Sequence, residues 1–250
     1  MTLNAQGKQY HVALGEGDVG KYVLLPGDPG RSKLIASYFD DSYHVATNRE
    51  YVTYTGFLDG VKVSVTSTGI GCPSTAIAVE ELVRVGADTF IRVGTSGAIQ
   101  KDIHSDELAI ITGAIRDEGT TTHYLPMAFP AVANIDTVLA LQKSAQKLGI
   151  KYRTGITQSK DSFYGEVEPE RMPVAPDLLN RWRAWEIGGA ICSEMEAAAL
   201  FIVSSMLKVR AGGVMQMHGI GPVEPLDNLI KVAIGGLREL IAMDNSSTKK

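Results

Sequence analysis

The chain has 250 residues and a mass of 26.8 kDa, and its 44% hydrophobic content is enough to bury a sizeable core in one domain. A formal net charge of −4 and a polar N-terminus with no apolar run long enough to span a bilayer exclude nucleic acid and membranes as expected partners and favour a cytoplasmic protein. Two cysteines, Cys72 and Cys192, are too few for a disulfide framework and lack zinc-site spacing, so we expect small buried side chains.

Short apolar runs alternate with longer helical patterns along the chain. The pattern predicts strands at residues 21–27, 61–69, 88–94, 107–115 and 209–217. It predicts helices at residues 73–87, 135–150 and 193–207 and a last helix at about 226–243. Because alternating strands and helices form a largely parallel sheet, we expect an α/β fold: a single domain over residues 1–250, with a mostly parallel twisted central sheet flanked by helices. Residues 244–250 resemble a disordered tail.

Glycine-rich loops in such folds bind ligands beyond the carboxyl ends of strands. The segment GEGDVG at 15–20 fits G-x-G-x-x-G, but a strand follows it instead of a helix, so we interpret it as a turn. The segment LLPGDPGRSKLI at 24–35 has the right order of strand, turn and helix. Gly27 permits close approach of an anion, and Arg31 would add charge-assisted hydrogen bonds. The alternative is an ordinary turn with a solvated arginine.

A second strand, in RVGTSGAIQ at 92–100, is predicted to end in an arginine. Arg92 is followed by Gly94 and by the hydroxyls of Thr95 and Ser96. Two such strand ends in one parallel sheet would converge on a tetrahedral oxyanion such as phosphate. The alternative is a buried ion pair between Arg92 and a carboxylate on a neighbouring strand, since a buried arginine needs a compensating anion.

Glu194 and Glu196 precede a helix that is apolar nearly all round. Ser193 and Glu196 have the spacing of a capping box at the start of that helix. A carboxylate that faces a cavity would instead accept hydrogen bonds from both hydroxyls of a vicinal diol, as in a ribose.

Eight motifs lie in order between about His11 and Arg210: LPGDPGR, NREY, TSTGIG, PSTAIAVEEL, IRVGTSGAI, FPAVA, KDSFYG and SEMEAAAL. Together they resemble the nucleoside phosphorylase family of hexameric type, and more closely its bacterial uridine phosphorylase branch. The resemblance implies phosphorolysis of uridine or a related pyrimidine nucleoside to free base and ribose 1-phosphate. This is a pentosyltransferase reaction of nucleoside catabolism and pyrimidine salvage, with phosphate as co-substrate and no cofactor.

The resemblance also implies the site residues. Phosphate would be bound by Gly27, Arg31, Arg92 and Thr95, together with Arg49 from a neighbouring subunit. The nucleoside would be bound by His11 from across a dimer interface and by Thr95, Ser96, Gly97, Phe163, Glu166, Glu194, Met195 and Glu196. The residues acting directly in catalysis would be Arg92, Thr95 and Glu196. A K⁺ ion would lie at the dimer interface on Glu50, Ile70 and Ser74, and the subunits would form dimers and a hexamer, as a trimer of dimers.

Two features depart from the family pattern, and both concern the base. Glu166 stands where a glutamine is expected, and an ionised carboxylate only accepts hydrogen bonds. Arg171 would reach the base or be a surface residue. The loop after Met217 is shortened, and His218 would act on the base or be structural or solvated. The alternatives are therefore a purine or broad-specificity phosphorylase, or a nucleoside- and phosphate-binding homologue that has lost turnover.

Overall fold

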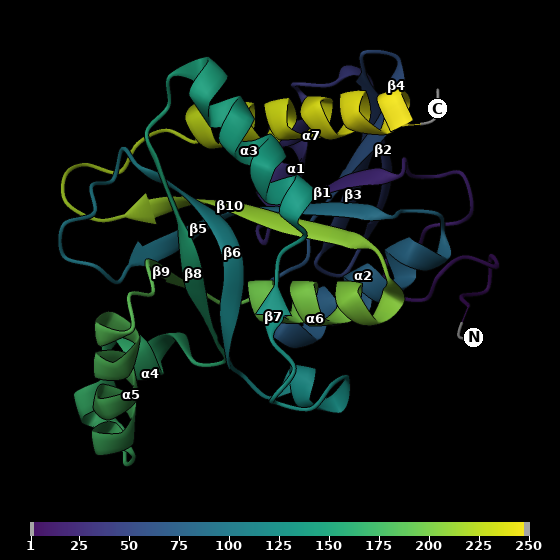
Figure 1. Cartoon of the computed structure of the whole chain (residues 1–250). Coiled ribbons are helices and arrows are strands. Elements are labelled where there is room, and N and C mark those ends of the chain that lie inside the picture. The colour runs from purple at the N-terminus through teal and green to yellow at the C-terminus, as the bar shows by residue number, and fades with distance from the viewer. Residues whose placement is uncertain (1–2, 248–250) are drawn as a thin grey trace.

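All ten strands in residues 3–247, the part of the chain that the computed structural model describes, belong to one sheet (Figure 1). The strands are β1 (Tyr22–Leu25), β2 (Asp40–Asn48), β3 (Tyr51–Leu58), β4 (Val61–Thr66), β5 (Thr89–Ala98), β6 (Leu108–Asp117), β7 (Ala131–Val132), β8 (Tyr152–Lys160), β9 (Cys192–Glu194) and β10 (Arg210–His218). The central pairings β4–β1–β5–β10 and β6–β8–β9 are parallel, whereas β3 pairs with its neighbours β2 and β4 in antiparallel fashion. The predicted α/β fold is confirmed.

Strand β5 is the centre of this arrangement because it pairs with β1, β9 and β10. The pairing of β10 with both β5 and β6 closes β5, β10, β6, β8 and β9 into a ring, which the sequence did not predict. Strand β5 was also expected to end near Gly94 but continues to Ala98. The reason is that β10 runs beside it as far as the pair His218 and Gly97. Arg92 therefore lies inside a strand instead of at its end.

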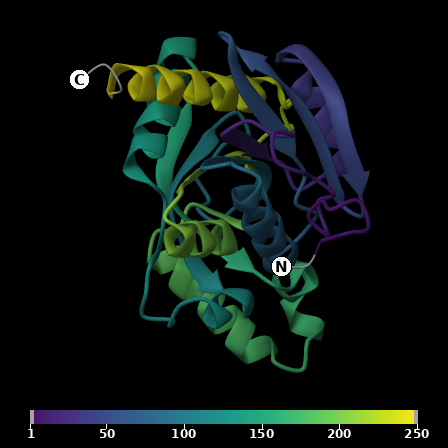
Figure 2. The ribbon, with the colours of Figure 1, turned by 90° about the vertical axis from the view of Figure 1, so that its right-hand side faces the viewer.

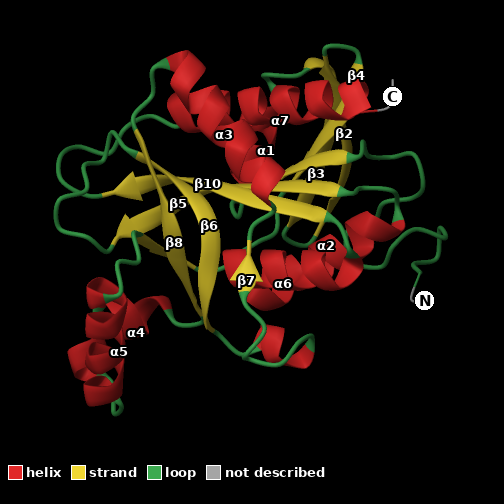
Figure 3. Cartoon of the chain, in the orientation of Figure 1, coloured by secondary structure: helices red, strands yellow, loops and turns green. Residues whose placement is uncertain are grey.

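Helices cover both faces of the sheet (Figures 1 and 2). The helices are α1 (Pro29–Ala36), α2 (Cys72–Arg84), α3 (Ile135–Leu148), α4 (Phe163–Val167), α5 (Ala175–Ile187), α6 (Ala197–Leu207) and α7 (Asp227–Ser247), and short 3-10 turns lie at Thr120–His123 and Pro169–Arg171. Helices α3 and α7 contact each other on one face with α1 nearby, and α2 contacts α6 on the other. Helices α4 and α5 extend from one end of the sheet (Figure 3), and no residue of α5 is fully buried.

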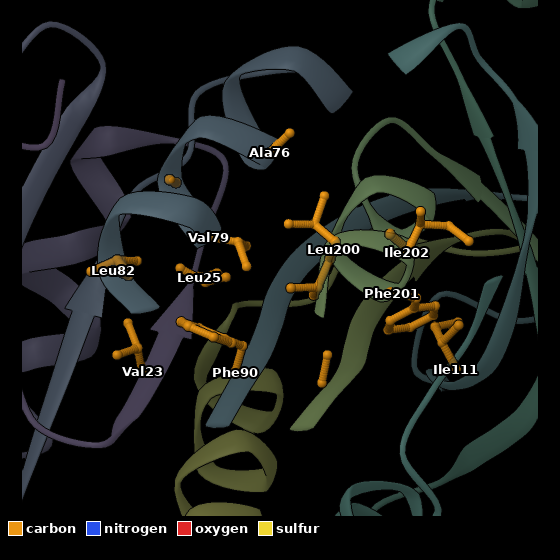
Figure 4. Packing of buried hydrophobic residues seen from close by; sticks show 14 of the residues in the cluster. Val23, Leu25, Ala76, Val79, Leu82, Phe90, Ile111, Leu200, Phe201 and Ile202 are labelled. Carbon is orange, nitrogen blue, oxygen red and sulfur yellow. The ribbon is translucent and has the colours of Figure 1, made fainter. Parts of the chain in front are cut away.

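Alternate residues of the strands face two separate cores, as the period of two in a β-strand requires. Val23, Leu25 and Phe90 point into the core under α2 and α6, where they meet Leu82 and Leu200 (Figure 4). Their sequence neighbours, Leu24 and Ile91 among them, belong to the core under α1, α3 and α7. The central strands are therefore buried on both faces.

The helical predictions are confirmed for α2 and α3, including Gly149 as the left-handed residue that ends α3. The segment at residues 15–20 is a turn before β1, as expected. None of the helices in residues 3–247 is long and apolar enough to cross a membrane.

The last helix extends beyond the predicted end at residue 243. Asp244 forms an ion pair with Arg210 and accepts a 2.6 Å hydrogen bond from the Tyr22 hydroxyl, which attaches this turn of α7 to β10 and β1. The prediction of a disordered tail is therefore wrong for residues 244–247, and its last three residues, 248–250, lie outside the described part of the chain.

Candidate functional site

A cavity of about 640 Å³ lies beyond the ends of β1, β8 and β10 and along the last part of β5. Twelve of the sixteen residues predicted for the site line it: Gly27, Arg31, Ile70, Arg92, Thr95, Ser96, Gly97, Phe163, Glu166, Glu194, Met195 and Glu196. They come from five separate segments of the chain. The lining also includes Lys160, Ser193 and His218, of which sequence reasoning had raised only His218 as a base-site candidate.

Arg92 is buried in this cavity and contacts two carboxylates. Its Nε atom lies 2.8 Å from Oε2 of Glu194, and its Nη2 atom forms a second ion pair with Glu196. Arg92 therefore forms the buried ion pair that the alternative interpretation expected, because Glu194 belongs to β9, the strand that pairs with β5. Burial by itself would lower the pKa of Arg92, but the two carboxylates outweigh it and raise the pKa, so the guanidinium stays charged.

The third nitrogen of this guanidinium has no partner. Nη1 of Arg92 is buried and makes no hydrogen bond within the described residues. It faces the loop at Gly27, where an added Cβ would lie 4.0 Å from it. Because an unsatisfied buried donor costs about 1–3 kcal/mol, and more when charged, its direction marks the place where an anion would be stabilised.

Gly94 provides the space for the guanidinium. A Cβ at this position would lie 3.0 Å from Cζ and from Nη2 of Arg92, closer than ordinary contact. Glycine is therefore required by the close approach of the arginine and not by a special backbone angle. On the opposite wall, the Asp28 side chain caps the first turn of α1 by accepting from the Gly30 amide at 2.8 Å, and Arg31 lies beside it.

The predicted capping box is wrong, because Ser193 belongs to β9 and the helix begins only at Ala197. Glu194 replaces it: its Oε2 accepts from the backbone amides of Glu196 and Ala197 at 2.8 and 2.9 Å, while Oε1 accepts from the Ser159 hydroxyl. Glu194 therefore fixes both the helix start and the position of Arg92.

Glu196 is the N-cap residue of α6, but its side chain makes no capping hydrogen bond and lines the cavity. Its Oε1 accepts a 2.6 Å hydrogen bond from the Gly71 amide, and Oε2 contacts Arg92. Burial raises the pKa of Glu196, although Arg92 opposes the shift. Burial is the largest cause of the raised pKa, and the nearby Glu194 carboxylate adds to it.

A second polar cluster lines the same cavity. Lys160, the last residue of β8, is buried, and its Nζ lies 2.9 Å from Oε2 of Glu166 and 2.5 Å from Oγ of Ser193. Lys160 is the first residue of the KDSFYG motif, but the sequence analysis predicted no strand that ends there, and nothing in the sequence alone paired Lys160 with Glu166. Phe163 is half exposed at the rim of the cavity.

The remaining base-site candidates divide into one inside and one outside the cavity. His218 ends β10 and lines the cavity with an exposed side chain. Arg171 does not line it: it pairs with Glu168 at 2.5 Å and lies over the Tyr164 ring at 5.4 Å. The surface interpretation therefore describes Arg171.

Two predicted residues, His11 and Arg49, lie together outside the cavity. The His11 Nδ1 atom lies 2.7 Å from Oε1 of Glu81, and Arg49 stacks over the Tyr10 ring at 5.8 Å. Asn48 connects the two segments by donating to the His11 carbonyl at 2.7 Å. Both residues that the family resemblance assigns to a neighbouring subunit thus share one surface of this chain.

The residues expected to hold a monovalent cation surround the turn at Gly69. A Cβ on Gly69 would lie 2.7 Å from Cγ of Glu50 and 3.0 Å from Oγ of Ser74, and Ile70 is 77% exposed. The Ser74 hydroxyl donates to the Thr68 carbonyl. Residues 3–247 contain no group of three or more His, Cys, Asp or Glu side chains placed to hold a metal ion.

Both cysteines are buried and unpaired, as expected. Burial raises the pKa of Cys192 to about 11 and raises that of Cys72 as well. They therefore remain thiols near neutral pH and do not act as nucleophiles.

Comparison with known proteins identifies the family of this arrangement. Residues 21–227 match the family model described as the phosphorylase superfamily. The chain is 46% identical to the uridine phosphorylase of Treponema pallidum over 95% of this chain and 96% of that protein. It is 48% identical to the uridine phosphorylase of Thermococcus kodakarensis, over 83% of this chain and 76% of that protein, and 40% identical to a guanosine phosphorylase of Halorubrum lacusprofundi, over 85% and 83%.

Proposed function

The chain belongs to the phosphorylase superfamily, and we propose that it cleaves uridine, or a related pyrimidine nucleoside, with phosphate to give the free base and ribose 1-phosphate. The observation that carries this proposal is the unpartnered Nη1 of the buried Arg92, directed at the Gly27 loop. The similarity to two uridine phosphorylases at 46–48% identity supports the choice of nucleoside.

Phosphate binds between the two walls that carry arginines. Arg92 and Thr95 approach it from β5, and Gly27 and Arg31 approach it from the loop before α1. Bound phosphate supplies the acceptor that Nη1 of Arg92 lacks. Arg31 supplies a second positive charge that stabilises the bound phosphate. Charge-assisted hydrogen bonds of this kind are roughly twice as strong as neutral ones.

The ribose lies between phosphate and base, on Met195 and Glu196. A phosphate oxygen attacks C1′ while the bond from C1′ to the base nitrogen breaks, through an oxocarbenium-like state, and the electron pair passes to the base. The proton that hydrogenphosphate gives up balances the one that the base nitrogen takes, so no covalent enzyme intermediate is needed. Positioning and charge complementarity supply the rate enhancement.

The active unit is at least a dimer, and the full assembly is a trimer of dimers. His11 and Arg49 lie away from this chain's own cavity, on one surface, so each would complete the site of a partner subunit. A two-fold interface is self-complementary, and each subunit therefore gives and receives the same residues.

A second candidate is a phosphorylase of broader base specificity. The observation in its favour is the 40% identity to a guanosine phosphorylase, together with Glu166 in place of the expected glutamine. A binding protein without turnover is less favoured, because the residues proposed for phosphate and ribose are all present in one cavity.

Release of free base from uridine, thymidine, inosine and guanosine, each with and without phosphate, tests the proposal and ranks the candidates. We expect phosphate-dependent release of uracil, at a kcat/KM well above that for either purine nucleoside. Preferred cleavage of guanosine or inosine would replace the first candidate by the second, and no cleavage of any nucleoside by a folded protein would favour the binding protein.

A further inference from the structure

Building on the proposed function, we propose that Lys160 and Glu166 act as one unit that recognises the base. In this unit the carboxylate accepts a hydrogen bond from a ring N–H, and the ammonium donates to the carbonyl oxygen beside it. The substrate class is then a nucleoside whose base carries an imide edge, as uracil does.

The two side chains come from different elements and contact each other in the cavity. Lys160 ends β8, Glu166 lies on α4, and Ser193 lies on β9, which pairs with β8 (Figure 1). Nζ of Lys160 is 2.9 Å from Oε2 of Glu166, and their side chains are only 8% and 15% exposed. Both line the same cavity as Arg92, Phe163 and Glu196, so they are within the proposed nucleoside site.

Each partner of this pair keeps capacity for a ligand. Oε1 of Glu166 makes no hydrogen bond within the described part of the chain and faces Gly97, where an added Cβ would lie 3.9 Å from it. The Lys160 ammonium has three donors, of which two are directed at Oε2 of Glu166 and Oγ of Ser193. One acceptor and one donor thus remain side by side.

Ser193 fixes the ammonium in this position. Its Oγ lies 2.5 Å from both Oε1 of Gln158 and Oε2 of Glu166, but its single hydrogen serves only one of them. Gln158 is itself held by a 2.8 Å hydrogen bond from its Nε2 to Asp117, which pairs with Arg181. This network places the charges before any substrate arrives, and such preorganisation is what electrostatic catalysis requires.

The pair resolves the chemical difficulty that Glu166 poses. A glutamine amide carries a donor and an acceptor in one side chain, whereas a carboxylate only accepts. The Lys160 ammonium supplies the missing donor and adds a positive charge. Since the departing pyrimidine takes the electron pair of the broken bond and spreads it onto its carbonyl oxygens, that charge stabilises the transition state more than the ground state.

Steady-state kinetics of the whole enzyme test the inference with three proteins: wild type, Lys160→Met and the double variant Lys160→Met/Glu166→Gln. For Lys160→Met we expect kcat/KM for uridine to fall by about 10- to 100-fold, as loss of a hydrogen bond from a charged donor implies, with KM for phosphate unchanged. The double variant should recover at least about 10-fold of that loss, because the amide alone supplies donor and acceptor. Lys101→Met, a lysine with an 89% exposed side chain, is the matched control.

Analogues and direct binding provide independent readouts. Wild type should cleave uridine at least about 100-fold better than 3-methyluridine, which lacks the ring N–H. Unchanged uridine kinetics in a folded Lys160→Met protein, or a double variant no better than Lys160→Met, would overturn the inference and leave the proposed function intact. If the wild-type protein lacks turnover, the proposed function fails, and calorimetry of uridine binding tests the inference instead. Weaker uridine binding by Lys160→Met than by wild type supports the base-recognition unit. Equal binding by the two proteins, or no binding by wild type, overturns it.

Discussion

The Nε atom of Arg92 lies 2.8 Å from Oε2 of Glu194, and both side chains are almost fully buried. Glu194 is held in turn by two backbone amides at the start of α6 and by Ser159. The arginine that is proposed to bind phosphate is therefore fixed by a carboxylate that the fold itself positions. Glu196, the second carboxylate on the same guanidinium, accepts a hydrogen bond from the backbone amide of Gly71 and lines the cavity, so it is the one proposed for the ribose.

Replacing Arg92 tests the phosphate site. Arg92→Lys keeps one positive charge but loses the fork that reaches Glu194, Glu196 and the Gly27 loop together. We expect kcat/KM for phosphate to fall by about 100- to 1000-fold, the usual effect of removing one preorganised donor. Arg238→Lys, on the surface of α7, is the control. Phosphate kinetics that stay within twofold of wild type in a folded variant would refute this role for Arg92.

Replacing Glu196 separates ribose binding from stability. Because burial raises the pKa of Glu196 in the folded protein, ionisation of this group costs stability above its folded pKa, and the cost is lost as the pH falls through that value. Glu196→Gln removes the cost while Glu194 still pairs with Arg92. We expect KM for the nucleoside to rise about 10-fold or more, and the Tm at pH 8 to be no lower than that of wild type. A large drop in Tm with an unchanged KM would show a purely structural carboxylate.

Gly94 tests the position of the guanidinium without changing any charge. In Gly94→Ala the new methyl group would lie 3.0 Å from Cζ of Arg92 and must displace it. A shift of about 1 Å in a positioning group is enough to lower activity by up to about 100-fold, and we expect the effect mainly in KM for phosphate. Gly15→Ala, where the nearest heavy atom would be 3.7 Å away, is the matched control. Equal phosphate kinetics for the two variants would mean that Arg92 does not need its observed position.

Mixing two variants tests whether sites are shared between subunits. Arg49→Ala and Arg92→Ala should each be nearly inactive if Arg49 completes a partner's site. After the subunits are dissociated and reassembled in equal amounts, about half of the dimers would be mixed, each with one intact site, which predicts about a quarter of the wild-type activity. Arg49→Ala with full activity, or a mixture that regains nothing, would contradict sharing.

Asp244 tests the attachment of the last helix. Its hydrogen bonds from Arg210 hold the pKa of Asp244 below the usual value for an aspartate, so its contribution to stability is present above that usual value and is lost as the pH falls through the folded pKa. Asp244→Asn should therefore lower the free energy of unfolding at pH 6 and reduce its decline below about pH 4. Urea unfolding from pH 3 to pH 7 measures this. Identical pH profiles for variant and wild type would show that the pair contributes nothing.

The sequence predicted the parts of the site that depend on residues close together in the chain. The strand–loop–helix order around Gly27 was predictable because a glycine and an arginine follow an apolar strand directly. The segment after Arg92 was recognised because a glycine and two hydroxyl side chains follow the arginine closely in the chain. Their convergence follows from the parallel order of β1 and β5, which places both segments at one edge of the sheet.

The features that the sequence did not predict depend on which strands pair with each other. β10 extends β5 to Ala98 and β9 includes Ser193, so the predicted strand end and the predicted capping box both failed for lack of knowledge of strand partners. Lys160 and Glu166 lie on separate elements, and only the pairing of β8 with β9 and the position of α4 bring them together with Ser193.

The reaction itself is tested most directly by ³¹P NMR of the wild-type protein with uridine and inorganic phosphate. Phosphorolysis predicts that the phosphate signal falls while a sugar phosphate signal rises, in proportion to the uracil released, and that omission of phosphate stops uracil release. Uracil released at the same rate without phosphate, with ribose and no ribose 1-phosphate as product, would contradict phosphorolysis and the assignment of Arg92 to phosphate.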